Sequence, residues 1–188
     1  MTGVQTCALP ISVAQAMHDN VILENVDIKK LQQTLMQDDC YIPWHQKQLP
    51  ELTKNADCSH EIVRNGMERC EENCWIGNQG DVIEYRFKAD SKISQIRLIF
   101  DSDFNRNYHN MPCNYPLVQT KFKLPETLIR EYKIEGISEN GQTHEIYITD
   151  NHQRFVTHNV DWCVKTLRFV PIATFGAEQF RLFSFEMQ

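Results

Sequence analysis

The sequence lacks any long apolar segment and any run of basic residues. Its apolar stretches are only a few residues long, far short of the roughly 20 residues that cross a bilayer. Its formal net charge is -6 at pH 7, and an acidic surface repels the phosphates of nucleic acids. We therefore expect neither a membrane nor a nucleic acid among its partners.

The glycine-rich nucleotide-binding motifs and the common hydrolase motifs are also absent. The chain contains no G-x-G-x-x-G, no P-loop lysine motif, no H-E-x-x-H and no G-x-S-x-G. Each of these motifs supplies a backbone cradle for phosphates, a set of metal ligands or an activated nucleophile. Without them, we expect the chain to be non-catalytic and to hold no cofactor of its own.

The length and hydrophobic content of the chain suffice for one globular domain and a short additional segment. A chain of 188 residues with 41% hydrophobic content can fill one core. Residues 1–12 resemble translated sequencing-adapter DNA, so we leave them out of the fold prediction. The rest divides into a helical segment at 13–39, a connector at 40–55 and a strand-rich domain at 56–188.

The cysteines favour free thiols over a disulfide framework, because seven of them stand at irregular spacings. Setting Cys7 aside with the adapter-like segment leaves an even number, which keeps disulfides open as an alternative. No two spacings repeat, however. We therefore expect a reducing, cytoplasmic location, with a secreted or periplasmic one as the alternative.

The helical pattern is clearest between Glu24 and Asp39, where Ile28, Leu31 and Leu35 share one face. Asp27 stands where its carboxylate can accept hydrogen bonds from the amides of the first turn. A helix this short is unstable alone in water, so its apolar face must dock on another surface.

In the connector, Pro43 and Pro50 interrupt both helix and strand. Its first residues, DDCYIPWH, bring Cys40 and His45 close together in sequence. A nucleophile and its base also need a third group that orients the base. Nothing nearby supplies that group, so we do not expect Cys40 and His45 to form a catalytic pair.

After residue 56, alternation of apolar and polar residues predicts short strands at 82–87, 94–103, 164–171 and 178–187. No long helical pattern interrupts them. They predict a mainly β fold, an antiparallel β-sandwich or jelly roll, preceded by the short helical segment.

The strongest local signal is a hairpin between 130 and 150, with Asn140 and Gly141 at its turn. A two-residue turn of this kind needs positive φ at both positions, and Asn-Gly is the pair that tolerates it best.

Two sets of residues could bind a ligand. Cys58, His60, Cys70 and Cys74 offer the soft or borderline ligands that zinc requires, but their spacing is not that of a zinc ribbon or finger. The alternative, which we favour, is that these cysteines are small buried residues that bind no metal. Polar or aromatic side chains on loops could instead hold Ca²⁺ or a sugar, although a solvated turn and a core tryptophan are the favoured interpretations. The loop candidates are Trp75, Asp101, Asp103, Asn105 and Arg106.

Several motifs resemble a known family. The stretch VDIKKLQQTLMQDDCYIP (26–43) is similar to the end of the catalytic region of bacterial FAD-dependent oxidoreductases, and IRLIFDSDFNR, MPCNYPL and GAEQFRLFSFEM are similar to their C-terminal extension. The extension itself resembles the galactose-binding-like, discoidin-like sandwich in IVRNGMERCEENCWIG (62–77) and YKIEGISENGQTHEIY (132–147).

This resemblance implies a non-catalytic module. Residues 13–39 would be the remnant of an upstream flavin domain of the same polypeptide, and FAD would bind in that parent protein rather than here. The stretch DDCYIPWH would be the hinge between that domain and the sandwich, with Cys40 and Tyr41 as packing residues. The module would be structural or would assist the parent's reaction. The alternative is an autonomous carbohydrate-binding module of galactose-binding-like type.

Overall fold

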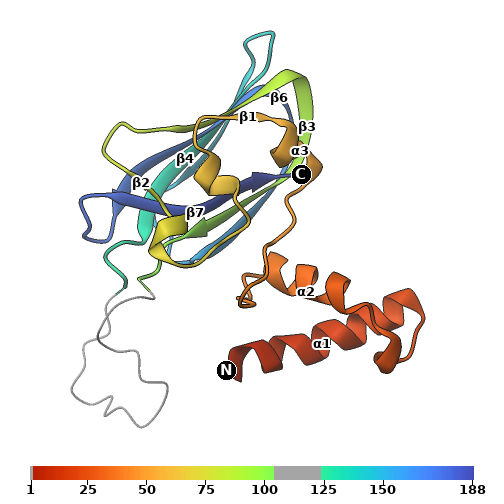
Figure 1. The fold of residues 1–188 in the computed structure, drawn as a ribbon. Coiled ribbons are helices and arrows are strands. Elements are labelled where there is room, and N and C mark those ends of the chain that lie inside the picture. Colours follow the sequence, from red (N-terminus) through yellow and green to blue (C-terminus); the bar gives the residue numbers. More distant parts are fainter. Residues whose placement is uncertain (1, 104–123) are drawn as a thin grey trace, which may run out of the picture.

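The strands confirm the predicted antiparallel, mainly β fold. The structure is a computed structural model that describes residues 2–103 and 124–188. Within them the sheet order is β2-β7-β3-β6-β4-β5, with β1 paired to β3, and every pairing is antiparallel (Figure 1). The strands are β1 (Asp57–Cys58), β2 (Trp75–Gly77), β3 (Ile83–Phe100), β4 (Ile129–Ile137), β5 (Thr143–Ile148), β6 (Phe155–Thr174) and β7 (Phe180–Met187).

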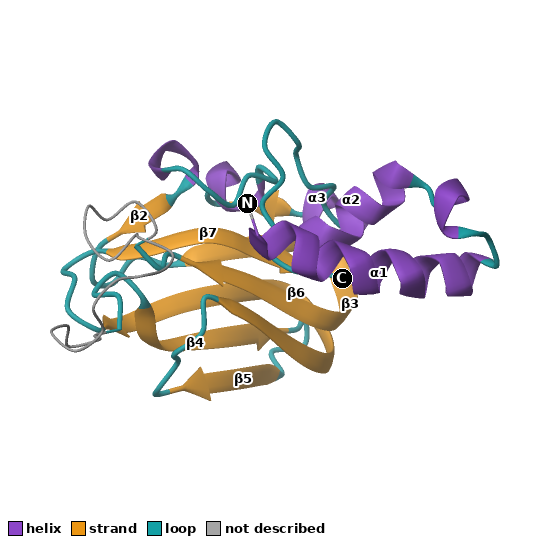
Figure 2. Ribbon diagram, turned by 90° about the horizontal axis from the view of Figure 1, so that it is seen from below, coloured by secondary structure: helices purple, strands orange, loops and turns teal. Residues whose placement is uncertain are grey.

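The two longest strands, β3 and β6, lie side by side at the centre of the sheet order. The strands predicted at 82–87 and 94–103 are one strand, β3, of 18 residues. Its pairing with β6 shifts register between Arg86 and Ser91 and again between Ile93 and Gln95. Such irregularities let a strand bend and continue instead of ending. The polar residues at the bend look like a turn in the sequence, which is why the prediction divided the strand. Figure 2 shows the antiparallel strands side by side.

Alternation along β3 places apolar side chains in the core, as predicted. Ile83, Tyr85 and Phe87 are buried, and so are Ile96, Leu98 and Phe100 farther along the strand. The Tyr85 hydroxyl donates a 2.8 Å hydrogen bond to the carbonyl oxygen of Phe185. This bond satisfies the only polar atom of a fully buried side chain.

The hairpin lies where it was predicted, but its turn is looser. Strands β4 and β5 flank it, with Ile137 opposite Thr143. Only Gly141 has a positive φ, 85°, so the expectation of a positive φ at Asn140 is wrong. The Asn140 side chain instead accepts from the backbone N–H of Gln142 at 3.0 Å. Five residues, 138–142, therefore lie between the two strands, and Gly141 supplies the left-handed conformation that the turn needs.

Helices α1 (Thr2–Asp19) and α2 (Ile28–Gln37) form a hairpin beside the sandwich (Figure 1). The Asp27 carboxylate accepts from the backbone N–H groups of Lys29 and Lys30, which confirms the predicted cap. Leu35 is buried, whereas Ile28 is 61% exposed. The apolar face of α2 is therefore covered at its C-terminal end only. In the described part of the chain, no helix is long and apolar enough to span a membrane.

The connector is packed against the sandwich and includes the short helix α3 (Glu51–Asn55), which begins directly after Pro50. Thr53 is buried, and its hydroxyl both donates to the carbonyl oxygen of Met187 and accepts from the Met187 N–H, at 2.7 and 2.8 Å. The interpretation of 40–55 as an irregular linker is therefore wrong for its second half. Short 3-10 helices at Glu61–Arg64 and Glu71–Asn73 follow it.

Candidate functional site

The end of helix α2 positions the first residue of the site, Asp39. The Cys40 N–H donates to the Leu35 carbonyl at 3.0 Å and the Asp39 N–H donates to the Met36 carbonyl at 3.2 Å. Asp39 itself has a φ of 60°. This is the Schellman motif, in which a left-handed residue reverses the chain and satisfies the last carbonyls of a helix. The reversal turns the Asp39 side chain toward the sandwich.

Two arginines from distant segments hold the Asp39 carboxylate. Arg69 donates to one carboxylate oxygen at 2.8 Å, and Arg154 donates to the other at 3.0 Å. Arg69 also donates to the Asp39 carbonyl oxygen at 3.0 Å. Arg154 reaches onward to the carbonyl oxygen of Phe100 at 2.7 Å. Charge-assisted bonds of this kind fix geometry as well as adding stability, so the connector has a set position on the sheet.

A second group of charges lies deeper. Lys47 is ion-paired with Glu186 of β7, and its Nζ is 3.9 Å from Glu68. Arg97 of β3 holds the Glu68 carboxylate with two donors, one of them at 3.0 Å. The same guanidinium donates to the carbonyl oxygens of Gln37 and Met36, at 3.0 and 3.1 Å. Arg97 therefore joins the last turn of α2 to the sheet.

Burial and pairing act in opposite directions on these cations. Burial lowers the pKa of Lys47, and the neighbouring Glu186 and Glu68 carboxylates only partly offset it. Burial also disfavours the charged Arg97, but the hydrogen bonds and charges of Glu68 and Glu186 prevail and raise its pKa. A buried charge is tolerated when it is paired and hydrogen-bonded, and both cations meet that condition.

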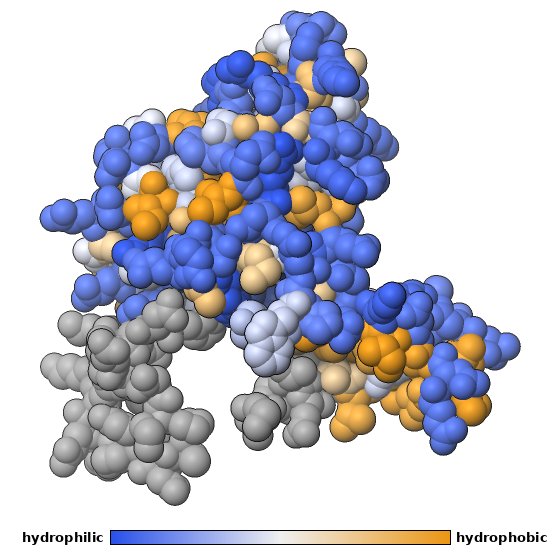
Figure 3. Space-filling view, in the orientation of Figure 1, coloured by the Kyte–Doolittle hydropathy of each residue, from blue (hydrophilic) through white to orange (hydrophobic). Residues whose placement is uncertain are grey.

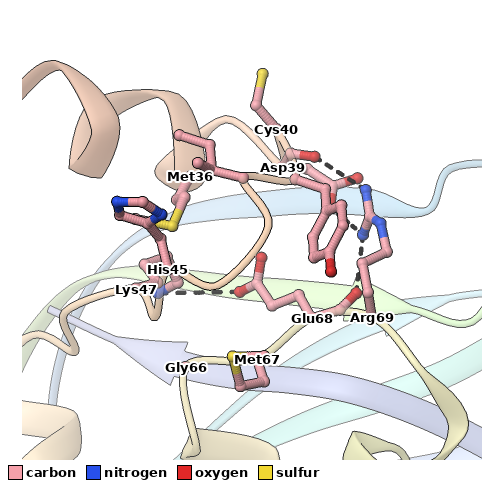
Figure 4. A pocket seen from close by; sticks show the side chains of 11 residues that line it. Met36, Asp39, Cys40, His45, Lys47, Gly66, Met67, Glu68 and Arg69 are labelled. Atoms are coloured by element: carbon pink, nitrogen blue, oxygen red, sulfur yellow. Dashed lines mark hydrogen bonds and ion pairs between the residues drawn. The ribbon is translucent and has the colours of Figure 1, made fainter. Parts of the chain in front are cut away.

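A small hollow, partly open to solvent, lies over these charges (Figure 4). Asp39, Lys47, Glu68 and Arg69 supply its polar groups, and Tyr41 and His45 stand among its other lining residues. Tyr41 is 43% exposed. The interpretation of Tyr41 as a packing residue is therefore wrong.

The same turn of the connector exposes an indole. Trp44 is 96% exposed and has a φ of 62°. The Nδ1 atom of His45 is 3.0 Å from the Pro43 carbonyl oxygen, which gives that ring nitrogen a partner within the turn. The site therefore combines exposed aromatic rings with a floor of hydrogen-bonding charges. This arrangement suits the binding of a polar organic ligand.

The predicted ligand loop is occupied by internal contacts as far as it is described. Trp75 is 4% exposed and packs edge-on against the His60 ring, so it is a core residue and not a ligand platform. Asp101 is buried and accepts from the Asp103 N–H at 3.0 Å, and its other oxygen is 3.8 Å from Arg181. Asn105 and Arg106 lie outside the described residues.

The weak zinc hypothesis receives no support from geometry. Among the described residues, no three His, Cys, Asp or Glu side chains come together as metal ligands would. The Cys58 thiol donates to the His60 carbonyl oxygen at 3.3 Å, whereas Cys70 is exposed. Burial raises the pKa of Cys74 to about 12, which keeps its sulfur as a thiol. Of these three cysteines, only Cys74 is fully buried as the alternative interpretation expects; Cys58 is partly buried.

Sequence reasoning missed the charged floor of the hollow. Arg97 and Glu186 stand in strands at positions that alternate with core residues, where a charge is normally in solvent. Neither strand position therefore carries a usable signal of burial. Lys47 carries none, since its burial depends on the folding of the connector onto β7.

Comparison with known proteins yields structural matches alone. No protein-family model and no curated protein sequence matches the chain. The family 32 carbohydrate-binding module of Streptococcus pneumoniae EndoD superimposes with a TM-score of 0.51 at 10% identity, covering 70% of this chain and 92% of that chain. A histidine mutant of the lectin binding domain of Lectinolysin, complexed with Lewis b, gives a TM-score of 0.52 at 8% identity, covering 74% and 96%.

At these identities the likeness concerns the fold. It says nothing about a flavin domain, so descent from a FAD-dependent oxidoreductase stays a prediction. The strand-rich part of the chain has the galactose-binding-like β-sandwich fold of family 32 carbohydrate-binding modules.

Proposed function

We propose that the chain is a non-catalytic carbohydrate-binding module. The observation that carries this proposal is a sandwich of the galactose-binding-like type that bears a solvent-open hollow with exposed aromatic residues on its connector. Two proteins of the same fold are named for carbohydrate or lectin binding, and one of them is complexed with Lewis b. The fold alone does not imply a function, so the local chemistry of the hollow is the second support.

Immobilised glycans provide the direct test. The purified chain is applied to an array that carries Lewis b, galactose-terminated and fucose-terminated glycans, and hits are titrated by calorimetry. We expect saturable binding of at least one neutral glycan. Absence of binding to every arrayed glycan at millimolar concentration would overturn the proposal.

A second candidate is a docking module of a larger flavoprotein, favoured by exposed apolar side chains on the α1–α2 hairpin. These side chains show as apolar patches on the surface of the hairpin (Figure 3). They include Met17, Ile22, Leu23 and Ile28. Contiguous apolar surface of this kind marks an interaction site. In this proposal the upstream flavin domain covers the hairpin, and the location is cytoplasmic.

Two observations would decide the second candidate. The chain alone should copurify without FAD, because the glycine-rich cofactor motifs are missing. Stoichiometric flavin in the purified chain would contradict that expectation. The genomic DNA upstream of the Ser12 codon should encode a glycine-rich dinucleotide-binding motif, and a different upstream domain would exclude flavoprotein parentage.

A further inference from the structure

We propose that Trp44 and the connector hollow form the saccharide site, and that its ligand is a neutral pyranose whose C–H face stacks on the indole. This inference rests on the proposed carbohydrate-binding function and adds the position of the site and the charge of the ligand. The residues concerned are Trp44 and Tyr41 for stacking, with Asp39 and Arg69 for hydroxyl groups.

The exposure of Trp44 is the first observation. Tryptophan is highly buried on average, yet this indole is 96% exposed on a backbone with a φ of 62°. Bulky residues rarely adopt positive φ, and such strain gathers at ligand sites. The turn is held on both sides, because the His45 N–H donates to the Ile42 carbonyl at 3.2 Å and the Lys47 N–H donates to the Gly66 carbonyl at 3.0 Å. The ring is thus displayed by a fixed turn.

The hollow beside this turn is the second observation. Ile42 and His45, the residues on either side of Pro43 and Trp44, both line it. Tyr41 adds a second exposed ring to the same lining. An aromatic face binds the C–H groups of a sugar ring by apolar contact, and ring edges allow the hydroxyl groups to remain hydrogen-bonded.

The paired charges of the site favour a neutral ligand over an anionic one. Asp39 is paired with Arg69 and Arg154, Lys47 with Glu186, and Glu68 with Arg97. An anionic ligand would have to compete with these carboxylates for the same cations. A hydroxyl group can accept from a guanidinium and donate to a carboxylate without breaking the ion pair between them. The partly exposed Asp39–Arg69 pair, joined at 2.8 Å, presents both kinds of group together.

The experiment compares the full chain with three variants in titrations with Lewis b, D-galactose and L-fucose, followed by calorimetry and tryptophan fluorescence. We expect Trp44→Ala to weaken binding of the best saccharide by about tenfold or more, and Trp44→Tyr to restore most of it. Tyr147→Ala is the matched control, because Tyr147 is a half-exposed aromatic residue on the edge strand β5, which β3, β6 and β4 separate from β7 in the sheet order. Its affinity should equal that of the unchanged chain.

The outcomes separate this inference from the proposed function. Saccharide binding that survives in Trp44→Ala would place the site elsewhere and leave the carbohydrate-binding function intact. Failure of the unchanged chain to bind any saccharide would overturn both. D-galacturonic acid tests whether the ligand is neutral. We expect it to bind no more tightly than D-galactose. A tenfold higher affinity that salt abolishes would overturn the claim that the ligand is neutral.

Discussion

The Lys47 ammonium and the Glu186 carboxylate form an ion pair although the residues lie 139 positions apart, and each side chain is only 1% exposed. The pair joins the connector to strand β7. Ser184 donates to the second Glu186 oxygen at 2.8 Å, so the carboxylate is satisfied on both sides. The position of the hollow over the sheet depends on this contact.

Removing one partner of this pair should be strongly destabilising. Lys47→Met leaves the Glu186 carboxylate buried beside Arg97 alone, and we expect the free energy of unfolding to fall by about 3–5 kcal/mol. Urea unfolding measures the change. The double variant Lys47→Met/Glu186→Leu removes both charges and should recover most of the loss. If the double variant is as unstable as the single one, the attraction within the pair contributes more to the free energy of unfolding than the burial of its two charges costs.

Asp39 should control how firmly helix α2 is attached. Asp39→Asn keeps a residue that tolerates positive φ but removes the charge that Arg69 and Arg154 share. We expect a loss of about 1–3 kcal/mol and faster amide exchange in the last turn of α2. Asp38→Asn, a change at the exposed neighbouring residue, serves as the control. Equal exchange rates in the two variants would contradict the anchoring role of Asp39.

Gly141→Val should destabilise the hairpin through the backbone. No atom lies within 4 Å of the Cβ that a side chain would add, so the cost comes from the φ of 85° and not from a clash. We expect a lower midpoint of thermal unfolding, corresponding to roughly 1–3 kcal/mol. Gln142→Val places the same β-branched side chain one position later, where φ is not positive, and should cost far less. An unchanged midpoint in Gly141→Val would mean that the turn adapts freely.

His158 should make stability depend on pH. Burial lowers its pKa below the ordinary value of 6.5, and its Nε2 atom is 2.9 Å from the Tyr132 hydroxyl. Above pH 6.5 the ring is neutral in both states, so its contribution to stability is constant. Below pH 6.5 the unfolded state binds the proton first, and the free energy of unfolding falls by at most about 1.4 kcal/mol per pH unit until the folded pKa is reached.

The comparison with His158→Gln isolates this effect. Glutamine keeps an acceptor for Tyr132 but does not titrate. Urea unfolding at pH 5, 6 and 7 should give a flatter profile for the variant than for the unchanged chain. Parallel profiles would show that another group causes the pH dependence.

The sequence by itself determined the elements whose signals are local. Alternation in β3 placed Ile83, Tyr85 and Phe87 inward, and Asp27 fixed the start of α2, because a strand's two faces and a helix's free amides depend on neighbours in the chain. The hairpin was located for the same reason. The number of positive-φ residues in its turn was not, since loop length depends on the register of β4 against β5.

The tertiary structure alone decided the candidate site. Lys47 and Glu186 are ordinary surface residues by sequence, and they become buried only when the connector folds onto β7. The continuity of β3 through its polar bend likewise depends on pairing with β6. Trp44 and Trp75 show the contrast most clearly, because they are the same residue type, yet one is almost fully exposed and the other almost fully buried. The burial of these residues is set by contacts between segments far apart in the chain, and the local sequence pattern does not predict those contacts.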